Sequence, residues 1–369
     1  MSKDILVMNI FNKFSSEHDI FKNEIILMPD YLPTDILHRE REIKEIVSSV
    51  SVLISGRKGE NLFLIGPPGT GKTCCSKYIL NELEQHTQRI LPIYINCWEY
   101  SSRFVILGLI ARELEMIVPR RGISVDEVIE KIIEGFQKSL YKGIVIVLDE
   151  VDRLFISKTG DKEVLYDLSR AKENFGINAA VIAISNNNEI LAKLDDRIRS
   201  SMSPRKLEFK SYDSIALKNI LNQRAKTAFH SNVLEEEVIP LCAAIGLNHK
   251  GDARISINAL WKAAKDAEKN GQEKVTVENV QNIKTSLKTE EEIKKELGKK
   301  IDYSLLNNNE KKVLKIIEKY KQIKTNELYK KLKITENEKR NIRNILEKFE
   351  KLNIIKIELE GNTRIIKLS

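Results

Sequence analysis

Short apolar runs alternate with amphipathic helical stretches between about residues 60 and 205. The runs NLFLIG, ILPIYIN, GIVIVLDE and AAVIAIS are rich in β-branched residues and end at turn-forming or polar residues. These features predict buried strands. Because helical patterns separate the runs, we expect an α/β fold in which a parallel sheet is connected by crossover helices.

The hydrophobic pattern changes twice in the rest of the chain. From 211 to 287, Leu, Ile and Ala recur at helical spacing without a strand-like run, which predicts an all-α domain. After the charged segment 288–300, three helical patterns precede two alternating runs around EGNT, which predicts a β-hairpin. We therefore expect an α/β domain over 1–207, a helical domain over 208–288 and a third domain over 296–369.

The 369 residues exceed the roughly 250–300 residues at which single cores stop growing, so more than one domain is expected. Charge is distributed unevenly along this chain. Residues 301–369 hold 17 Lys and Arg against 10 Asp and Glu, and so carry nearly all of the net charge of +8. This asymmetry favours a polyanion-binding module at the C-terminus, with a lysine-rich solvated surface as the alternative.

Three features bear on the cellular compartment. No apolar run reaches the roughly 18 residues that can span a membrane. The first residues, MSKDILVMNIFNKF, lack the apolar core and small residues of a signal peptide. The four cysteines lack metal-ligand spacing, so we expect reduced thiols and a cytoplasmic protein.

The stretch GPPGTGKT at 66–73 matches the Walker A phosphate-binding loop. It follows the strand NLFLI and precedes a helical pattern, which is the context that this loop requires. Its glycines let backbone N–H groups face phosphate oxygens, and the helix N-terminus adds partial positive charge. We expect Lys72 to reach the β- and γ-phosphates and Thr73 to ligate Mg²⁺. The predicted nucleotide contacts in this stretch are Gly66, Pro67, Pro68, Gly69, Thr70, Gly71, Lys72, Thr73 and Cys74.

A Walker B motif, DEVDRL, follows the apolar run GIVIVL. Asp149 ends this predicted strand, where its carboxylate can hold Mg²⁺. Glu150 is then placed to polarise the attacking water as the general base. On its own, an Asp-Glu pair could be a simple strand end, but the Walker A loop earlier in the chain favours the catalytic interpretation.

Two polar positions downstream resemble the sensor residues of the AAA+ ATPases. Asn186 follows the strand AAVIAIS, where sensor 1 orients water or touches the γ-phosphate, and Asn187 or Asn188 could take its place. Asp252 has the character of a helix N-cap, so Arg254 falls in the first turn, where a cation opposes the helix dipole. AAA+ proteins carry sensor 2 at this place, and an exposed structural arginine is the alternative.

The order of these motifs resembles the archaeal initiators of the origin recognition complex/cell division control family, a branch of AAA+. PDYLPTDILHREREIKEI (29–46) is similar to the N-terminal signature that borders the adenine pocket in that family. SYDSIALKNILNQRA (211–225) is similar to the start of its lid domain. The resemblance implies that Tyr212 and Arg224 contact nucleotide, whereas a packed aromatic ring and a surface arginine are the alternative.

Residues near 97–130 resemble the helical insert that touches DNA in this family. Arg103 and Arg120 are the DNA contacts that the resemblance implies, although 96–140 holds 6 basic against 7 acidic residues and its composition adds no support. Clamp-loader relatives supply an arginine finger from a Ser-Arg-Cys, and two serines stand at 200–201 here. Because an arginine finger can be worth ~10³–10⁵ in rate, we expect slow, switch-like ATP hydrolysis.

A basic amphipathic helix is predicted at 335–352, with Thr335 and Glu338 as a capping box. The helical spacing predicts a core-facing side made of Ile342, Ile345, Leu346, Phe349 and Leu352. A shorter helix before it, TNELYKKLK, and the hairpin after it complete the pattern of a winged helix.

DNA contacts are expected on the open side of this helix and at the hairpin tip. Arg343 and Asn344 are the candidates for reading bases, or they merely hold the duplex. A winged helix used only for protein contacts is the alternative. The full set of predicted DNA contacts in this domain is Lys339, Arg340, Arg343, Asn344, Lys348, Asn362 and Arg364.

These expectations combine into one hypothesis of function. The protein is an ATP-dependent replication initiator that binds double-stranded origin DNA and helps to recruit the replicative helicase, with ATP/ADP and Mg²⁺ as its cofactors. Further initiator paralogues on DNA are candidate partners, no membrane is expected, and the protein is placed on the nucleoid. The alternatives are a transcription regulator or a plasmid- or virus-borne paralogue, and a branch-migration motor, which the double serine disfavours.

Overall fold

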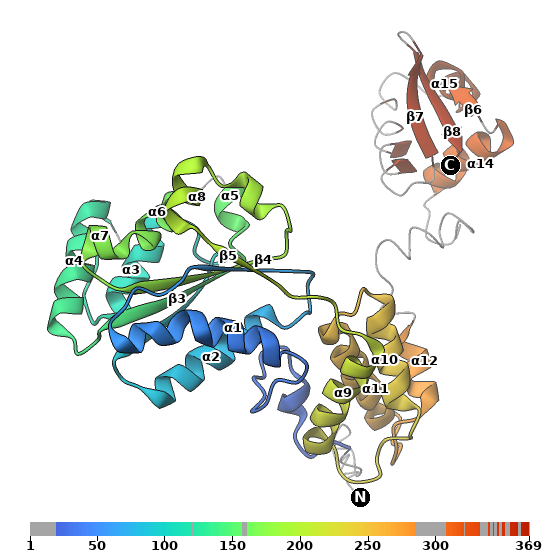
Figure 1. Ribbon diagram of the computed structural model, residues 1–369. Coiled ribbons are helices and arrows are strands. Elements are labelled where there is room, and N and C mark those ends of the chain that lie inside the picture. The colour runs from blue at the N-terminus through green and yellow to red at the C-terminus, as the bar shows by residue number, and fades with distance from the viewer. Residues whose placement is uncertain are drawn as a thin grey trace, which may run out of the picture. The chain divides into compact units, whose positions relative to one another are not determined.

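The computed structural model contains two compact units, Met1–Ile283 and Lys284–Ser369 (Figure 1). The residues that the structure describes are 20–119, 121–156, 161–284, 308–320, 322–332, 355–360, 363–368 and the single positions 339, 342, 345, 346, 349 and 350.

A five-stranded parallel sheet lies at the centre of the first unit, with the strand order β2-β3-β4-β1-β5. The strands are β1 (Leu62–Ile65), β2 (Ile90–Asn96), β3 (Gly143–Asp149), β4 (Ala179–Ser185) and β5 (Arg205–Glu208). The four predicted strands and their parallel arrangement are confirmed. β5 is not predicted from the sequence, because this edge strand reads RKLE and has no buried residue.

Alternate residues of the central strands face two separate hydrophobic cores, as the twofold period of a strand requires. In β3, Ile144, Ile146 and Leu148 belong to one core, whereas Val145 and Val147 belong to the other.

Helices cover both faces of the sheet (Figure 1). On the Val145 face they are α1 (Glu40–Ser51) and α2 (Lys72–His86), with the 3₁₀ helix η3 (Val52–Ser55) beside them. On the Ile146 face they are α3 (Arg103–Glu113), α4 (Val125–Lys138), α5 (Arg153–Ile156), α6 (Glu163–Ser169), α7 (Ala171–Phe175), α8 (Asp196–Met202) and the 3₁₀ helix η4 (Ile190–Lys193).

The parallel strands bring distant polar residues to one edge of the sheet. The phosphate-binding loop follows β1, Glu150 follows β3, and Asn186 follows β4. Because the carboxyl ends of neighbouring parallel strands meet at the same edge, this edge is where a ligand site is expected.

Four helices complete the first unit, which confirms the predicted all-α segment. They are α9 (Ser214–Ala228), α10 (Val238–Asn248), α11 (Ala253–Lys269) and α12 (Val277–Lys284). The short 3₁₀ helix η2 (Glu24–Leu27) packs against them, since Phe21 stacks on Phe229 with ring centroids 5.3 Å apart and the Trp261 indole donates to Glu24 at 2.7 Å. Within the described ranges, no helix combines the length and the apolar character needed to cross a membrane.

The second unit contains a small antiparallel sheet with the strand order β6-β8-β7. Its elements are α14 (Asn308–Tyr320), β6 (Gln322–Lys324), α15 (Thr325–Leu332), β7 (Ile355–Glu360) and β8 (Thr363–Leu368). The predicted hairpin is therefore present as β7 and β8, and its pairing closes at Glu360 and Thr363. Ile342, Ile345, Leu346 and Phe349 are buried in the core of this unit, as their spacing predicts, while Leu352 lies outside the described residues.

Candidate nucleotide site

The phosphate-binding loop joins β1 to α2 and has the glycine conformations that it needs. Gly69 and Gly71 lie in the left-handed region, with φ of 71° and 89°. A Cβ atom on Gly69 would lie 1.8 Å from the Asp252 carboxylate, and one on Gly71 would lie 2.7 Å from the Tyr212 hydroxyl. Both glycines are thus required by backbone conformation and by close packing. The loop also places Gly71 as the N-cap of the 15-residue α2, an arrangement that suits an anion.

Lys72 is buried at the start of α2. Its Nζ donates to the carbonyl oxygens of Gly66 at 2.7 Å and Pro67 at 2.8 Å. Burial lowers the pKa of Lys72 to about 8, an effect that the carboxylates of Asp149 and Glu150 oppose. The ammonium group therefore lies within the loop, close to where its backbone would meet phosphate oxygens.

The Asp149 carboxylate joins three parts of the site. Its Oδ2 accepts hydrogen bonds from the Thr73 hydroxyl at 2.7 Å and from the Tyr94 hydroxyl at 2.8 Å. Its Oδ1 accepts from the Glu150 backbone N–H at 2.9 Å. Tyr94 is not predicted from the sequence, since it comes from β2 and lies 55 residues from its partner.

The Thr73 and Asp149 side chains have the chemistry that Mg²⁺ prefers, since a hydroxyl and a carboxylate oxygen already meet. Among the described residues, no group of three or more His, Cys, Asp or Glu could hold a metal ion by itself. This composition fits Mg²⁺, which usually takes only one or two protein ligands at nucleotide sites and completes its shell with waters and phosphate oxygens.

Glu150 has a left-handed backbone with φ of 55°, an uncommon conformation for a residue other than glycine. Both of its carboxylate oxygens lie 3.3 Å from the Asn186 amide nitrogen, so Asn186 is the asparagine of the three that contacts it. Burial and the neighbouring Asp149 raise the pKa of Glu150. The predicted base and the predicted sensor therefore lie side by side.

Asp152 follows β3 and is bonded to the end of β4, a role that is not predicted from the sequence. Its Oδ1 accepts from the Ser185 hydroxyl at 3.0 Å, and its Oδ2 lies 3.3 Å from the Asn186 backbone nitrogen that donates to it. Asp152 thus fixes the loop that carries Asn186.

The N-terminus of α11 contacts the phosphate-binding loop. Asp252 caps this helix as predicted, accepting from the backbone N–H groups of Arg254 and Ile255. The Ala253 N–H donates to the Gly69 carbonyl at 3.2 Å. Arg254 keeps 64% of its side chain exposed and pairs with Asp252 at 3.2 Å.

Tyr212 and Arg224 lie in different surroundings. Tyr212 is buried against Gly71, and burial raises the pKa of its hydroxyl. Arg224 is also buried, and it donates to the carbonyl oxygens of Ile26 at 2.8 Å and Tyr31 at 3.4 Å. The guanidinium of Arg224 is therefore engaged by the segment before α1, and its nucleotide contact stays a prediction.

An open groove lies between α1, α2 and α9. It is lined by six residues of the predicted adenine-pocket signature, between Asp35 and Lys44, together with Val47, Tyr78 and Gln223. The groove is thus formed by α1 and the segment before it, by α2 and by α9.

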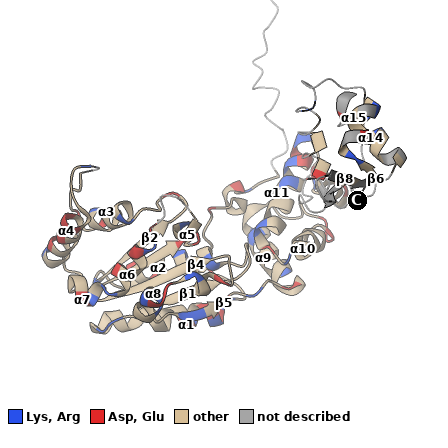
Figure 2. Cartoon of the chain, turned by 90° about the horizontal axis from the view of Figure 1, so that it is seen from above, with Lys and Arg blue, Asp and Glu red and all other residues tan. Residues whose placement is uncertain are grey.

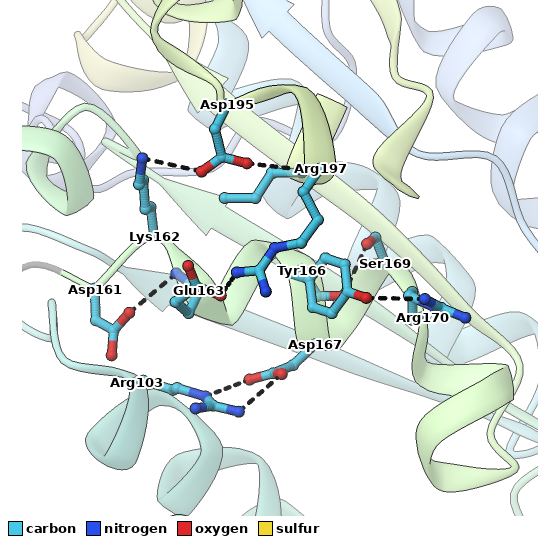
Figure 3. Close-up of polar contacts among 11 residues, drawn as sticks. Arg103, Asp161, Lys162, Glu163, Tyr166, Asp167, Ser169, Arg170, Asp195 and Arg197 are labelled. Atoms are coloured by element: carbon cyan, nitrogen blue, oxygen red, sulfur yellow. Dashed lines mark hydrogen bonds and ion pairs between the residues drawn. The ribbon is translucent and has the colours of Figure 1, made fainter. Parts of the chain in front are cut away.

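The predicted DNA contact Arg103 has a partner within the chain. Its guanidinium binds the Asp167 carboxylate through two hydrogen bonds, of 2.5 Å and 2.9 Å, and Asp167 is buried (Figure 3). The second candidate of the insert, Arg120, lies outside the described residues. Acidic residues outnumber basic ones on α4, so this helix of the insert is not basic (Figure 2).

The two arginines before the double serine are also engaged. Arg197 pairs with Glu163 and lies over the Tyr166 ring, with its guanidinium carbon 4.5 Å from the ring centre (Figure 3). Arg199 donates to the carbonyl oxygens of Leu191 at 3.2 Å and Leu194 at 3.1 Å.

Most of the predicted DNA contacts of the second unit lie outside the described residues. Lys339 is half-buried, with its Nζ 5.7 Å from the Tyr329 ring centre, and Arg364 belongs to β8. The predicted DNA contacts outside the described residues are Arg340, Arg343, Asn344, Lys348 and Asn362. Thr335 and Glu338 of the predicted capping box also lie outside the described residues. These contacts stay predictions.

Comparisons with known proteins identify relatives across most of the chain. Residues 56–191 match the AAA domain, and residues 218–285 match the Cdc6 AAA+ ATPase-type lid domain. The chain is 37% identical over 274 residues to ORC1-type DNA replication protein 1 of Sulfurisphaera tokodaii, covering 74% of this chain and 68% of that protein. It is 35% identical over 286 residues to the ORC1-type DNA replication protein of Thermococcus kodakarensis, covering 75% and 68%.

A solved structure has a similar fold. The Aeropyrum pernix ORC1 protein in complex with DNA matches with a TM-score of 0.68 and 28% identity, over 95% of this chain and 94% of that one. The Pyrobaculum aerophilum Cdc6p structure, at 23% identity and a TM-score of 0.66, has a similar fold.

Proposed function

Because this chain belongs to the ORC1-type family of DNA replication proteins, whose AAA+ and Cdc6-type lid domains it shares, we propose that it initiates replication by binding origin DNA under the control of ATP. ATP binding and slow hydrolysis act as the switch. The observation that supports this best is the meeting of the phosphate-binding loop, Asp149, the Glu150–Asn186 pair and the start of α11 at one edge of the sheet.

Each part of the site has a role in nucleotide binding. Lys72 and the backbone N–H groups of the loop bind the phosphates, and the groove at Tyr78 receives the adenine. Thr73 and Asp149 are the residues that would hold Mg²⁺, which supplies charge neutralisation at the phosphates. Arg254 reaches the γ-phosphate from α11, as its exposure and the contact of the preceding Ala253 with Gly69 allow.

Hydrolysis depends on Glu150 as the general base. Its carboxylate accepts a proton from the attacking water, and the Asn186 amide holds that carboxylate in place. No arginine of α8 is free for a neighbouring site in the described residues, since Arg197 and Arg199 have partners within the chain. Turnover is therefore slow, and a steady-state rate of many turnovers per second by the isolated protein would contradict this.

DNA is the proposed partner of the basic second unit. The related A. pernix protein was solved in complex with DNA. In this chain, residues 301–369 carry 17 basic against 10 acidic residues, which favours phosphate contact by a winged helix. The ATP state sets how DNA is engaged and whether the replicative helicase is recruited, with initiator paralogues as further partners on DNA.

The test is DNA footprinting with ATP, with ADP and without nucleotide, on origin DNA of the host beside random DNA. The wild-type protein and Glu150→Gln are compared, because this variant should bind ATP normally and hydrolyse it at least about 10²-fold more slowly. We expect protection of origin DNA that differs between ATP and ADP, and a persistent ATP pattern in Glu150→Gln.

Two results would overturn the proposal. Footprints that are the same with ATP, with ADP and without nucleotide would exclude control of DNA binding by the nucleotide. Binding in the cell confined to promoters, with none at replication start points, would instead assign the protein to transcription regulation.

A further inference from the structure

We propose that Arg39 is a positioning residue that couples the phosphate-binding loop to the hinge between the sheet and the helical lid. The hinge is residues 209–213, which connect β5 to α9. The inference rests on the proposed function in one respect, which is that the loop binds a nucleotide. It adds the group through which an occupied loop sets the position of the lid.

The Arg39 guanidinium is buried where the loop and the hinge meet. Only 5% of the residue is exposed. Its Nε donates to the Thr70 carbonyl of the loop at 2.9 Å, and its Nη2 donates to the Lys210 carbonyl of the hinge at 2.6 Å. One rigid planar group therefore bonds to both segments, which are 31 and 171 residues away in the sequence.

The remaining donors of Arg39 fix the guanidinium in this orientation. Its Nη1 donates to the His38 carbonyl at 3.2 Å and to the Glu42 carboxylate at 3.3 Å, both next to the start of α1. A buried arginine with its donors satisfied in this way has little freedom to adopt another rotamer. It therefore transmits a displacement of one carbonyl to the other.

Tyr212 extends the contact into the lid. The Arg39 guanidinium carbon lies 4.0 Å from the centre of the Tyr212 ring, and the hydroxyl of that ring lies against Gly71. The next residue, Asp213, caps α9 by accepting from the Ala216 N–H at 2.8 Å. A shift at Gly71 thus reaches the first turn of α9 through a stacked ring and a cap.

The second lid helix near the loop, α11, meets the same stack. A Cβ atom on Gly251 would lie 2.3 Å from the Tyr212 carbonyl oxygen, and Ala253 donates to the Gly69 carbonyl. The loop, the hinge and the starts of α9 and α11 therefore surround Arg39 and Tyr212. Because interactions that differ between two states create coupling between sites, a group bonded to both loop and hinge is placed to carry it.

Hydrogen exchange with mass spectrometry tests the inference on the full chain, with ADP, with ATP and without nucleotide. In the wild type we expect nucleotide to protect both the loop peptide 66–73 and the hinge peptide 209–228. Arg39→Lys keeps the charge but replaces the rigid planar pair of donors with a single ammonium on a flexible stem, and Arg39→Gln removes the charge. Both variants should keep the loop protection and lose about tenfold of the hinge protection, which corresponds to about 1.4 kcal/mol of coupling.

The matched control is Arg41→Lys, which changes an exposed arginine two residues further along α1 and should leave both peptides at wild-type protection. If Arg39→Gln does not fold, Arg39→Lys and Tyr212→Leu decide, since the latter keeps Arg39 and removes its stacked ring. A purely structural Arg39 would lower the thermal stability and leave the ratio of hinge to loop protection unchanged, and that result would overturn the proposal. Absence of loop protection in the wild type would instead refute nucleotide binding itself.

Discussion

At the scale of single residues, the Asp149 carboxylate illustrates how the site is held. One oxygen accepts hydrogen bonds from the Thr73 and Tyr94 hydroxyls, and the other accepts one from a backbone N–H. A carboxylate with fixed donors can ligate a metal ion in only a few orientations, so Tyr94 would restrict the orientation that Asp149 offers to the proposed Mg²⁺.

Tyr94→Phe removes one hydroxyl and leaves the ring that packs in the sheet. Loss of such a supporting group typically costs about 10–100-fold in metal affinity or activity. We expect the Mg²⁺ concentration for half-maximal ATPase activity to rise by about tenfold, while nucleotide affinity without Mg²⁺ stays unchanged. Titration of activity with Mg²⁺ checks this, and Tyr100→Phe is the control on a partly exposed tyrosine. An unchanged Mg²⁺ requirement in Tyr94→Phe would remove Tyr94 from the site.

The site residues that can be predicted from the sequence differ in one physical respect from those that cannot. Lys72, Asp149 and Glu150 sit in short motifs whose spacing reflects a local backbone geometry. Tyr94 and Arg39 act through partners 55 and 31 residues away, which no local pattern contains. Only the sheet and the crossover connections bring these pairs together.

At the scale of elements, the same contrast separates buried strands from edge strands. β1, β3 and β4 are buried on both faces and read as continuous apolar runs, so their positions are predictable. β5 and β6 are short strands at sheet edges with exposed polar residues, and their pairing depends on neighbours far along the chain. β5 and β6 therefore become recognisable only when the sheets that they join are known.

The Arg103–Asp167 pair connects α3 to α6, so Arg103 has a structural partner beside its predicted DNA contact. Burial raises the pKa of Asp167 in spite of the adjacent guanidinium, so its charge is costly without that partner. Breaking a fully buried pair costs about 3–5 kcal/mol. Because Arg103 keeps 29% of its side chain exposed, we expect Arg103→Met to lower the free energy of unfolding by about 2 kcal/mol at neutral pH.

The pH dependence of this loss has a definite sign. A carboxyl group whose folded pKa is raised binds its proton more tightly in the folded state, so stability falls as pH rises through that pKa. The loss of unfolding free energy in Arg103→Met should therefore be fully present at neutral pH. It should become smaller as the pH falls toward the ordinary aspartate pKa near 3.9. Urea unfolding at several pH values measures it, and adding Asp167→Leu should recover most of the stability. Lost DNA affinity with an unchanged unfolding midpoint would instead support the DNA contact.

At the scale of the whole molecule, the proposed function is divided between two units of different character. The first unit contains every described residue of the candidate nucleotide site, and the second carries most of the excess positive charge. Composition and hydrophobic pattern reveal this division, because each depends on averages over many residues. They cannot identify which side chains meet DNA, since base contacts depend on individual orientations.

The division predicts how a chain that ends at residue 284 behaves. It retains both hydrophobic cores of the sheet and the lid, so we expect it to fold and to hydrolyse ATP within about threefold of the full-chain rate. Its affinity for DNA should fall by at least about 10²-fold at 50 mM salt, because most phosphate contacts are lost. Fluorescence anisotropy across a salt series checks this, since the slope of log affinity against log salt reports about 0.9 per phosphate contact. If the shortened chain kept the slope of the full chain, the phosphate contacts would belong to the insert near α3 and α4, and the basic C-terminal residues would be a solvated surface.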